Sequence, residues 1–163
     1  MDVKLVRIHK GEAEKLWEMQ VRAFHDLYEK YQDTETSPAA ESVDQIRMKL
    51  KQPFTYYYFF MADNIAVGAI RVVDKRVEGT AKRISPIFIM PEHRNKGLAQ
   101  AAIKIAEQIH GCSNWELDTI LQEKGNCHLY EKMGYRKTGK VRIVNDKMTL
   151  VFYRKNKYPF EIF

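Results

Sequence analysis

The chain has 163 residues, of which 45% are apolar, and its 27 basic and 21 acidic residues give a net charge of +6 at pH 7. This length suits one domain, which we expect to span residues 1–163, and no apolar run is long enough to cross a bilayer or to act as a signal peptide. The basic residues are dispersed among acidic ones, so we expect a cytoplasmic protein with neither a membrane nor a nucleic-acid partner.

Strand-like and helix-like segments alternate through the N-terminal half of the chain. Runs rich in β-branched and aromatic residues predict strands, and aromatic residues at helical spacing predict an amphipathic helix. Ser42 and Gln45 have the spacing of a capping box, which predicts the start of a second helix, and Pro53 ends it. The expected elements are a strand at 3–8, helices at 11–31 and 43–50, and strands at 54–62 and 65–73.

The C-terminal half continues this alternation. Pro86 lies inside an apolar strand and cannot donate to a ladder, so it predicts a bulge that bends the strand away from its neighbour. Gly134 closes a short helix as a left-handed cap residue. The expected elements are a strand at 82–90, a helix at 98–110, a strand at 115–119, a helix at 126–133, and strands at 135–144 and 147–153. The sequence therefore predicts an α/β domain with the order βααβββαβαββ.

An anion site is predicted where the strand at 82–90 meets the next helix. Residues 87–100 read IFIMPEHRNKGLAQ, so an apolar strand runs into a polar turn and Gly97 opens the helix. A helix N-terminus presents free amides and partial positive charge, which favour phosphate, and neither Gly97 nor Ala99 blocks close approach. The nucleotide-binding patterns GxxxxGK[ST] and GxGxxG are absent. A glycine turn flanked by solvated charges stays the alternative.

Two motifs resemble the GNAT family of N-acetyltransferases. Residues 94–99 (RNKGLA) match its R/Q-x-x-G-x-G/A signature, and residues 129–135 (LYEKMGY) resemble its LYEKxGF block. The order of the predicted elements resembles the family over nearly the whole chain. The resemblance implies the acyl-CoA N-acyltransferase fold, a single mixed and mostly antiparallel sheet flanked by helices.

The resemblance also implies acetyl-CoA as cosubstrate and a set of residues that would bind it. Backbone groups of the strand would pair with the pantetheine arm as an added strand would, and the amides after Arg94 would hold the pyrophosphate. The implied cofactor-binding residues are Ile87, Phe88, Ile89, Arg94, Asn95, Lys96, Gly97, Leu98, Ala99, Gln100 and Asn126.

The implied reaction moves the acetyl group directly to a primary amine of a small molecule or peptide. Tyr130 matches the tyrosine credited as general acid near the sulfur, and a tyrosine that packs the helix against the sheet is the alternative. Asp118 lies on the strand where some family members carry an acidic base, with Glu116 two residues earlier. A solvated or sheet-edge carboxylate is the alternative for both.

Several features leave the function open. Glu123 stands where many family members have asparagine, and Asn126 either substitutes for that residue or caps the helix. The cysteines and histidines have no metal-ligand spacing, so we expect no metal. The apolar tail at residues 158–163 is a candidate for docking on the domain or on a partner subunit, so a homodimer is a further expectation. A catalytically silent acyl-CoA-binding module on the same fold is the alternative function.

Overall fold

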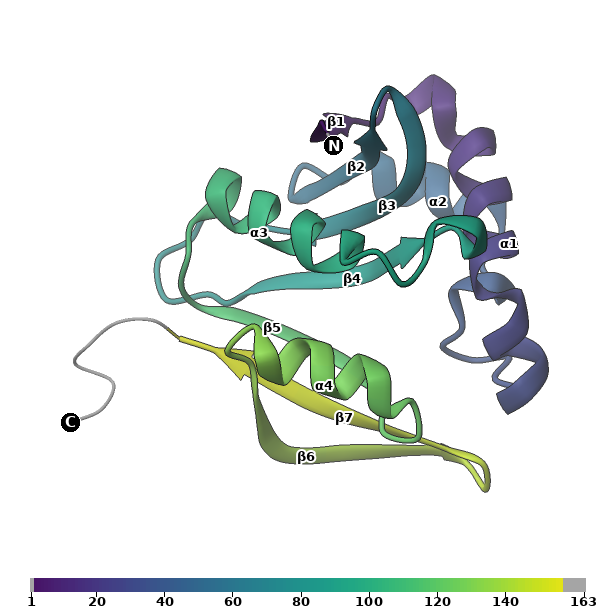
Figure 1. Cartoon of the computed structure of the whole chain (residues 1–163), viewed down its shortest axis with the longest axis vertical. Helices are drawn as coiled ribbons and strands as arrows, with labels where there is room; N and C mark the ends of the chain where they lie inside the picture. The colour runs from purple at the N-terminus through teal and green to yellow at the C-terminus, as the bar shows by residue number, and fades with distance from the viewer. Residues whose placement is uncertain (1, 157–163) are drawn as a thin grey trace.

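A computed structural model describes residues 2–156 and shows a mixed seven-stranded sheet with helices on both faces (Figure 1). The strands are β1 (Val3–Arg7), β2 (Thr55–Ala62), β3 (Ile65–Val73), β4 (Lys82–Ile89), β5 (Trp115–Ile120), β6 (Arg136–Asn145) and β7 (Met148–Lys155). The helices are α1 (Ala13–Tyr31), α2 (Val43–Leu50), α3 (Leu98–His110) and α4 (Lys124–Lys132), with short 3-10 turns η1 (Lys10–Glu12), η2 (Pro38–Ala40) and η3 (Pro91–His93). The predicted element order is confirmed, and the tail at 158–163 lies outside the described residues.

The sheet has the strand order β1-β2-β3-β4-β5-β7-β6. Every neighbouring pair is antiparallel except β4 and β5, which run parallel. This arrangement confirms the expected mixed, mostly antiparallel sheet. The parallel pair lies at its centre, where the chain crosses from β4 to β5 through α3.

Two helical layers cover the sheet because successive strand residues point to opposite faces. Tyr57 and Phe59 on β2 pack with α1 and α2, through residues such as Leu16 and Ile46. Tyr58, between them in sequence, packs on the other face in a cluster that includes side chains of α3 and α4. The aromatic run of β2 is therefore core on both faces, and all four residues from 57 to 60 are buried.

A bulge at Pro86 separates β4 from β5. The β3–β4 register shifts between Ile70 and Val72, which leaves Ser85 and Pro86 opposite Arg71. Only two residue pairs join β4 to β5, Lys82 with Trp115 and Arg83 with Glu116. Beyond them the two strands diverge (Figure 1). The predicted bulge and divergence are confirmed, and the second half of β4 has one free edge.

Gly68 on β3 is required for close contact with β4. A Cβ atom at this position would lie 2.2 Å from the Phe88 carbonyl oxygen, far inside van der Waals contact. We expect Gly68→Ala to lower the free energy of unfolding by about 1–3 kcal/mol, the usual cost of overpacking, as measured by urea denaturation. Gly11→Ala is the control, because a Cβ there meets nothing within 4 Å. Equal stability of the two variants would contradict this contact.

Candidate active site

A cavity of about 310 Å³ opens where β4 and β5 diverge. Its walls come from α1, the segment 33–38, β4, β5, α4 and the β6–β7 hairpin. Four of the residues singled out from the sequence line it: Ile87, Asp118, Asn126 and Tyr130. The fold thus brings together side chains that lie up to 43 positions apart in the sequence, between residues 87 and 130.

Tyr130 projects from α4 into this cavity. The residue is buried, and its ring packs against those of Tyr135 and Tyr153, with centroids 6.1 and 6.3 Å away. Its hydroxyl makes no hydrogen bond with any residue in the described range 2–156. Burial, and then the nearby Asp118 charge, raise the pKa of Tyr130 above its ordinary value. The hydroxyl therefore stays protonated at neutral pH and can donate into the cavity.

Asp118 forms an ion pair across the divergence of the two strands. Its Oδ1 lies 3.1 Å from Nη2 of Arg83 on β4, and both side chains are about one quarter exposed, at 22% and 28%. Glu116, the alternative acidic residue, instead lies 3.9 Å from Arg154 and does not line the cavity. Of the two predicted carboxylates, only Asp118 therefore faces the site.

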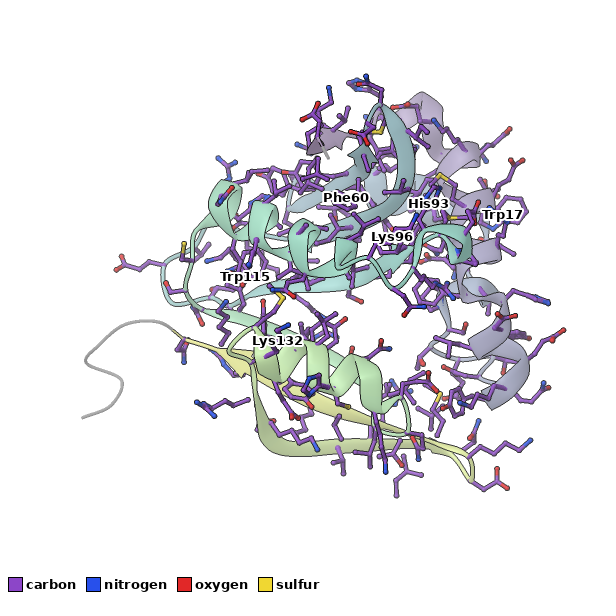
Figure 2. All side chains as sticks on the ribbon, viewed as in Figure 1. Trp17, Phe60, His93, Lys96, Trp115 and Lys132 are labelled. Atoms are coloured by element: carbon purple, nitrogen blue, oxygen red, sulfur yellow. The ribbon has the colours of Figure 1, made fainter. Side chains whose placement is uncertain are left out.

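At the N-terminus of α3, several backbone N–H groups donate no hydrogen bond to any described residue. Gly97 precedes the helix with a φ of 72°, and no side chain caps it. The amides of residues 95–100 have no hydrogen-bond partner within residues 2–156. A Cβ on Gly97 would meet nothing within 4 Å, so the space in front of these amides is open. Figure 2 shows Lys96 and His93 at the turn that leads into α3.

Arg94 follows η3 and makes two hydrogen bonds to backbone carbonyls. Its Nε donates to the Ile89 carbonyl at 3.0 Å and its Nη2 to the Ala23 carbonyl at 2.7 Å. These two hydrogen bonds connect the turn to the end of β4 and to α1. Arg94 and Lys96 are both exposed and lie at the turn that precedes the open amides.

In the second half of β4, alternate residues direct their backbone N–H and C=O groups to the edge that no strand pairs with. Met90 donates its amide to the Val67 carbonyl at 2.8 Å, and the Phe88 carbonyl oxygen faces Gly68, so Phe88 directs its backbone groups to β3. Backbone groups alternate between the two edges of a strand. Ile87 and Ile89 therefore direct theirs to the free edge, where Arg94 already occupies the Ile89 carbonyl.

Asn126 does not cap α4, so the cap interpretation is wrong. The helix begins at Lys124 with Glu123 as its N-cap residue, and Asn126 lies inside the first turn, exposed at the cavity. The Glu123 carboxylate accepts hydrogen bonds from Lys30 Nζ at 2.8 Å and from the Tyr31 hydroxyl. These contacts with α1 fix the start of α4 two residues earlier than predicted.

The Glu123 cluster gives an expected pH dependence of stability. Burial raises the pKa of Glu123, but hydrogen bonds from Lys30 and Tyr31 outweigh it and hold the pKa below 4.5. A lowered folded-state pKa stabilises the protein above the unfolded pKa, and this stabilisation is lost as the pH falls through the folded value.

We expect Glu123→Gln to lower the melting temperature at pH 7. The difference from the unmodified protein should shrink below about pH 4, as the carboxylate is protonated. Glu29→Gln is the control, because within residues 2–156 the exposed Glu29 carboxylate contacts only His25. Scanning calorimetry from pH 3 to pH 7 measures both. A difference that stays constant over this range would contradict the cluster's role.

Two further residues of the cavity had no signal in the sequence. Arg83 lines it opposite Asp118, at the point where β4–β5 pairing ends. Asp33 is only 3% exposed and accepts hydrogen bonds from the amides of Glu35 and Thr36, at 3.0 and 2.9 Å. These bonds form a local turn after α1, but the contact of this segment with the cavity is not visible in the sequence.

Residues 14–135 match the model of the acetyltransferase (GNAT) family. The chain belongs to this family. A curated relative, N-acetyltransferase 8 of Homo sapiens, is 33% identical over 76 residues, which are 45% of this chain. The match spans 34% of that protein's length, about a third.

Solved structures of the family share the fold. The PaiA N-acetyltransferase of Thermoplasma acidophilum, solved with coenzyme A, has a TM-score of 0.67 and 15% identity, covering 96% of this chain and 100% of that one. The spermidine N-acetyltransferase of Vibrio cholerae, solved with CoA and spermine, has a TM-score of 0.71 and 16% identity over 93% of both chains. The microcin C7 self-immunity acetyltransferase MccE, solved with acetyl-CoA and AMP, has a TM-score of 0.72 and 15% identity, covering 96% of this chain and 93% of that one. The acyl-CoA N-acyltransferase fold is thereby confirmed.

Within residues 2–156, no helix is both long and apolar enough to cross a membrane. The same range contains no group of three or more His, Cys, Asp or Glu side chains placed to hold a metal ion.

Proposed function

We propose that the chain is an N-acetyltransferase that uses acetyl-CoA to acetylate a primary amine of a small molecule or peptide. The observation that supports this most is the free hydroxyl of Tyr130 in a cavity between the diverged β4 and β5. Family membership supports the same reaction class. A cytoplasmic location and a homodimer are further parts of the proposal.

The chain offers a fitting surface for acetyl-CoA. The open amides of residues 95–100 suit a pyrophosphate, because a helix N-terminus binds anions through N–H groups and its dipole, and Gly97 leaves the approach clear. The free edge at Ile87 and Ile89 suits the amide groups of a pantetheine arm. Asn126 lies on the α4 side of the same cavity. When bound there, acetyl-CoA would supply an acetyl group activated as a thioester.

The cavity side chains supply two proton-transfer groups. An acceptor amine must lose a proton as its nitrogen–carbon bond forms, and the Asp118 carboxylate, directly or through water, is the proposed base. The Tyr130 hydroxyl would donate its proton to the sulfur as the carbon–sulfur bond breaks. Both side chains line the same cavity, which supports assigning them to one reaction centre.

Isothermal titration with acetyl-CoA tests the cofactor half of this proposal. We expect saturable one-site binding that free coenzyme A displaces, since both share the pyrophosphate and the pantetheine arm. Heat signals no larger than those of dilution, from a protein shown by circular dichroism to be folded, would contradict the proposal.

A further inference from the structure

Arg83 lines the cavity with unused hydrogen-bond donors. Its side chain is 28% exposed, and its Nη2 lies 3.1 Å from Oδ1 of the Asp118 carboxylate. It makes no hydrogen bond of normal geometry with any group in residues 2–156. A guanidinium carries five N–H donors in a planar fork, so most of this fork is available to a ligand in the cavity.

The charges that line the cavity are balanced. Asp33 and Asp118 are its carboxylates, and Arg83 and Arg142 are its cations. A site for a polycationic acceptor needs an excess of carboxylates, because each guanidinium repels an ammonium group. Balanced charges of both signs suit a ligand that itself carries both signs.

A second guanidinium strengthens the positive side of this arrangement. Arg71 lies behind the β4 bulge and donates to the Ser85 carbonyl at 3.0 Å, and no carboxylate of residues 2–156 is in hydrogen-bond contact with it. Burial, chiefly, and the nearby Arg83 charge lower the pKa of Arg71. Arg71 thus brings a second guanidinium near Arg83, while the Glu41 charge acts on Arg71 and raises its pKa, and Asp118 pairs with Arg83.

One part of the cavity wall is apolar. It is formed by side chains from α1, the end of β5 and the start of β7: Phe24, Leu27, Ile120, Met148 and Leu150. This surface suits an aliphatic or aromatic group, since burying apolar area is favourable by about 25 cal/mol per Å².

We infer that the acceptor is an amine with a carboxylate next to its amino group, as in an amino acid with an apolar side chain, and that Arg83 binds this carboxylate. The inference rests on the proposed function and names its substrate class. The paired guanidinium N–H groups match the two carboxylate oxygens. The amino group then lies beside Asp118, and the side chain lies against the apolar wall.

Matched acceptor pairs test this inference directly. Phenylalanine, leucine and methionine are each compared with the amine that decarboxylation of the amino acid gives, with spermidine as a polycation. Calorimetry on the protein saturated with coenzyme A measures binding, and thiol release from acetyl-CoA measures turnover. We expect at least one amino acid to bind and react with a kcat/KM about 10- to 100-fold above that of its amine, the worth of a charged hydrogen bond.

Variants assign the effect to Arg83. Arg83→Met also breaks the ion pair with Asp118, which affects both substrates alike. It should remove the preference for the carboxylate by raising KM about 10- to 100-fold more for the amino acid than for the matched amine. Arg83→Lys should keep part of the preference for the carboxylate, because a single ammonium group replaces the paired N–H donors of the guanidinium. Arg154→Met is the control, since Arg154 contacts Glu116 outside the cavity.

The outcomes separate this inference from the proposed function. If the unmodified protein prefers the decarboxylated amines or spermidine, the inference is overturned while acetyl transfer stands. If no amino acid binds to the protein saturated with coenzyme A, the inference is also overturned. An unchanged preference in Arg83→Met would overturn the role of Arg83. Failure of the proposed function is seen separately, as an absence of acetyl-CoA binding.

Discussion

Gly97→Trp is expected to abolish acetyl-CoA binding. The six amides of residues 95–100 have no hydrogen-bond acceptor within residues 2–156, and a Cβ on Gly97 would meet nothing within 4 Å. An indole there would fill the volume that the pyrophosphate needs. The substitution also places a large residue at a φ of 72°, where L side chains cost about 1–2 kcal/mol. Titration calorimetry with acetyl-CoA measures the loss.

Gly79→Trp is the matched control for this variant. Gly79 has a φ of 84° and a Cβ there also meets nothing within 4 Å, but it lies in the loop between β3 and β4. We expect it to share the backbone cost and to bind acetyl-CoA as the unmodified protein does. If Gly97→Trp keeps its helical content and binds acetyl-CoA with unchanged affinity, acetyl-CoA does not bind at the N-terminus of α3.

Tyr130→Phe is expected to slow acetyl transfer by about 10²- to 10⁴-fold, the usual contribution of one general acid. Acetyl-CoA affinity should be unchanged, because the phenyl ring keeps its packing against Tyr135 and Tyr153. Stability should change little, since the lost hydroxyl has no partner within residues 2–156. Thiol release under saturating acetyl-CoA measures the rate, and calorimetry measures the affinity.

Tyr153→Phe provides the opposite pattern as a control. Tyr153 is fully buried, and its hydroxyl donates to Glu131 at 2.7 Å outside the cavity. Its loss should lower the melting temperature and leave the transfer rate nearly unchanged. If Tyr130→Phe retains the full transfer rate, Tyr130 is a packing residue and another group protonates the sulfur.

The features that could be predicted from the sequence have local causes. Pro86 cannot donate to a ladder, and this alone indicates the bulge that parts β4 from β5. Ser42 and Gln45 do form the predicted capping box, with both reciprocal hydrogen bonds present. Gly97 marks the start of α3 for a similar reason, since few other residues accept its left-handed conformation. The element order followed from such signals.

The features that could not be predicted depend on contacts between distant parts of the chain. The start of α4 is set by Lys30 and Tyr31 on α1, more than 90 positions before Glu123. Arg83 meets Asp118 only because the strands diverge beyond it. The Arg94 side chain donates to the Ala23 carbonyl, 71 positions away. Residue spacing within one segment cannot predict contacts between segments this far apart in the sequence.

The central claim is transfer of an acetyl group to an amine, and product analysis tests it most directly. The protein is incubated with acetyl-CoA labelled with a heavy isotope in the acetyl group and with the amino acids and amines named above. Mass spectrometry then follows the label. We predict labelled N-acetyl product in equal amount to the free thiol released, and its near absence with Tyr130→Phe. Acetyl-CoA that binds but leaves no amine labelled above the protein-free reaction would contradict the claim.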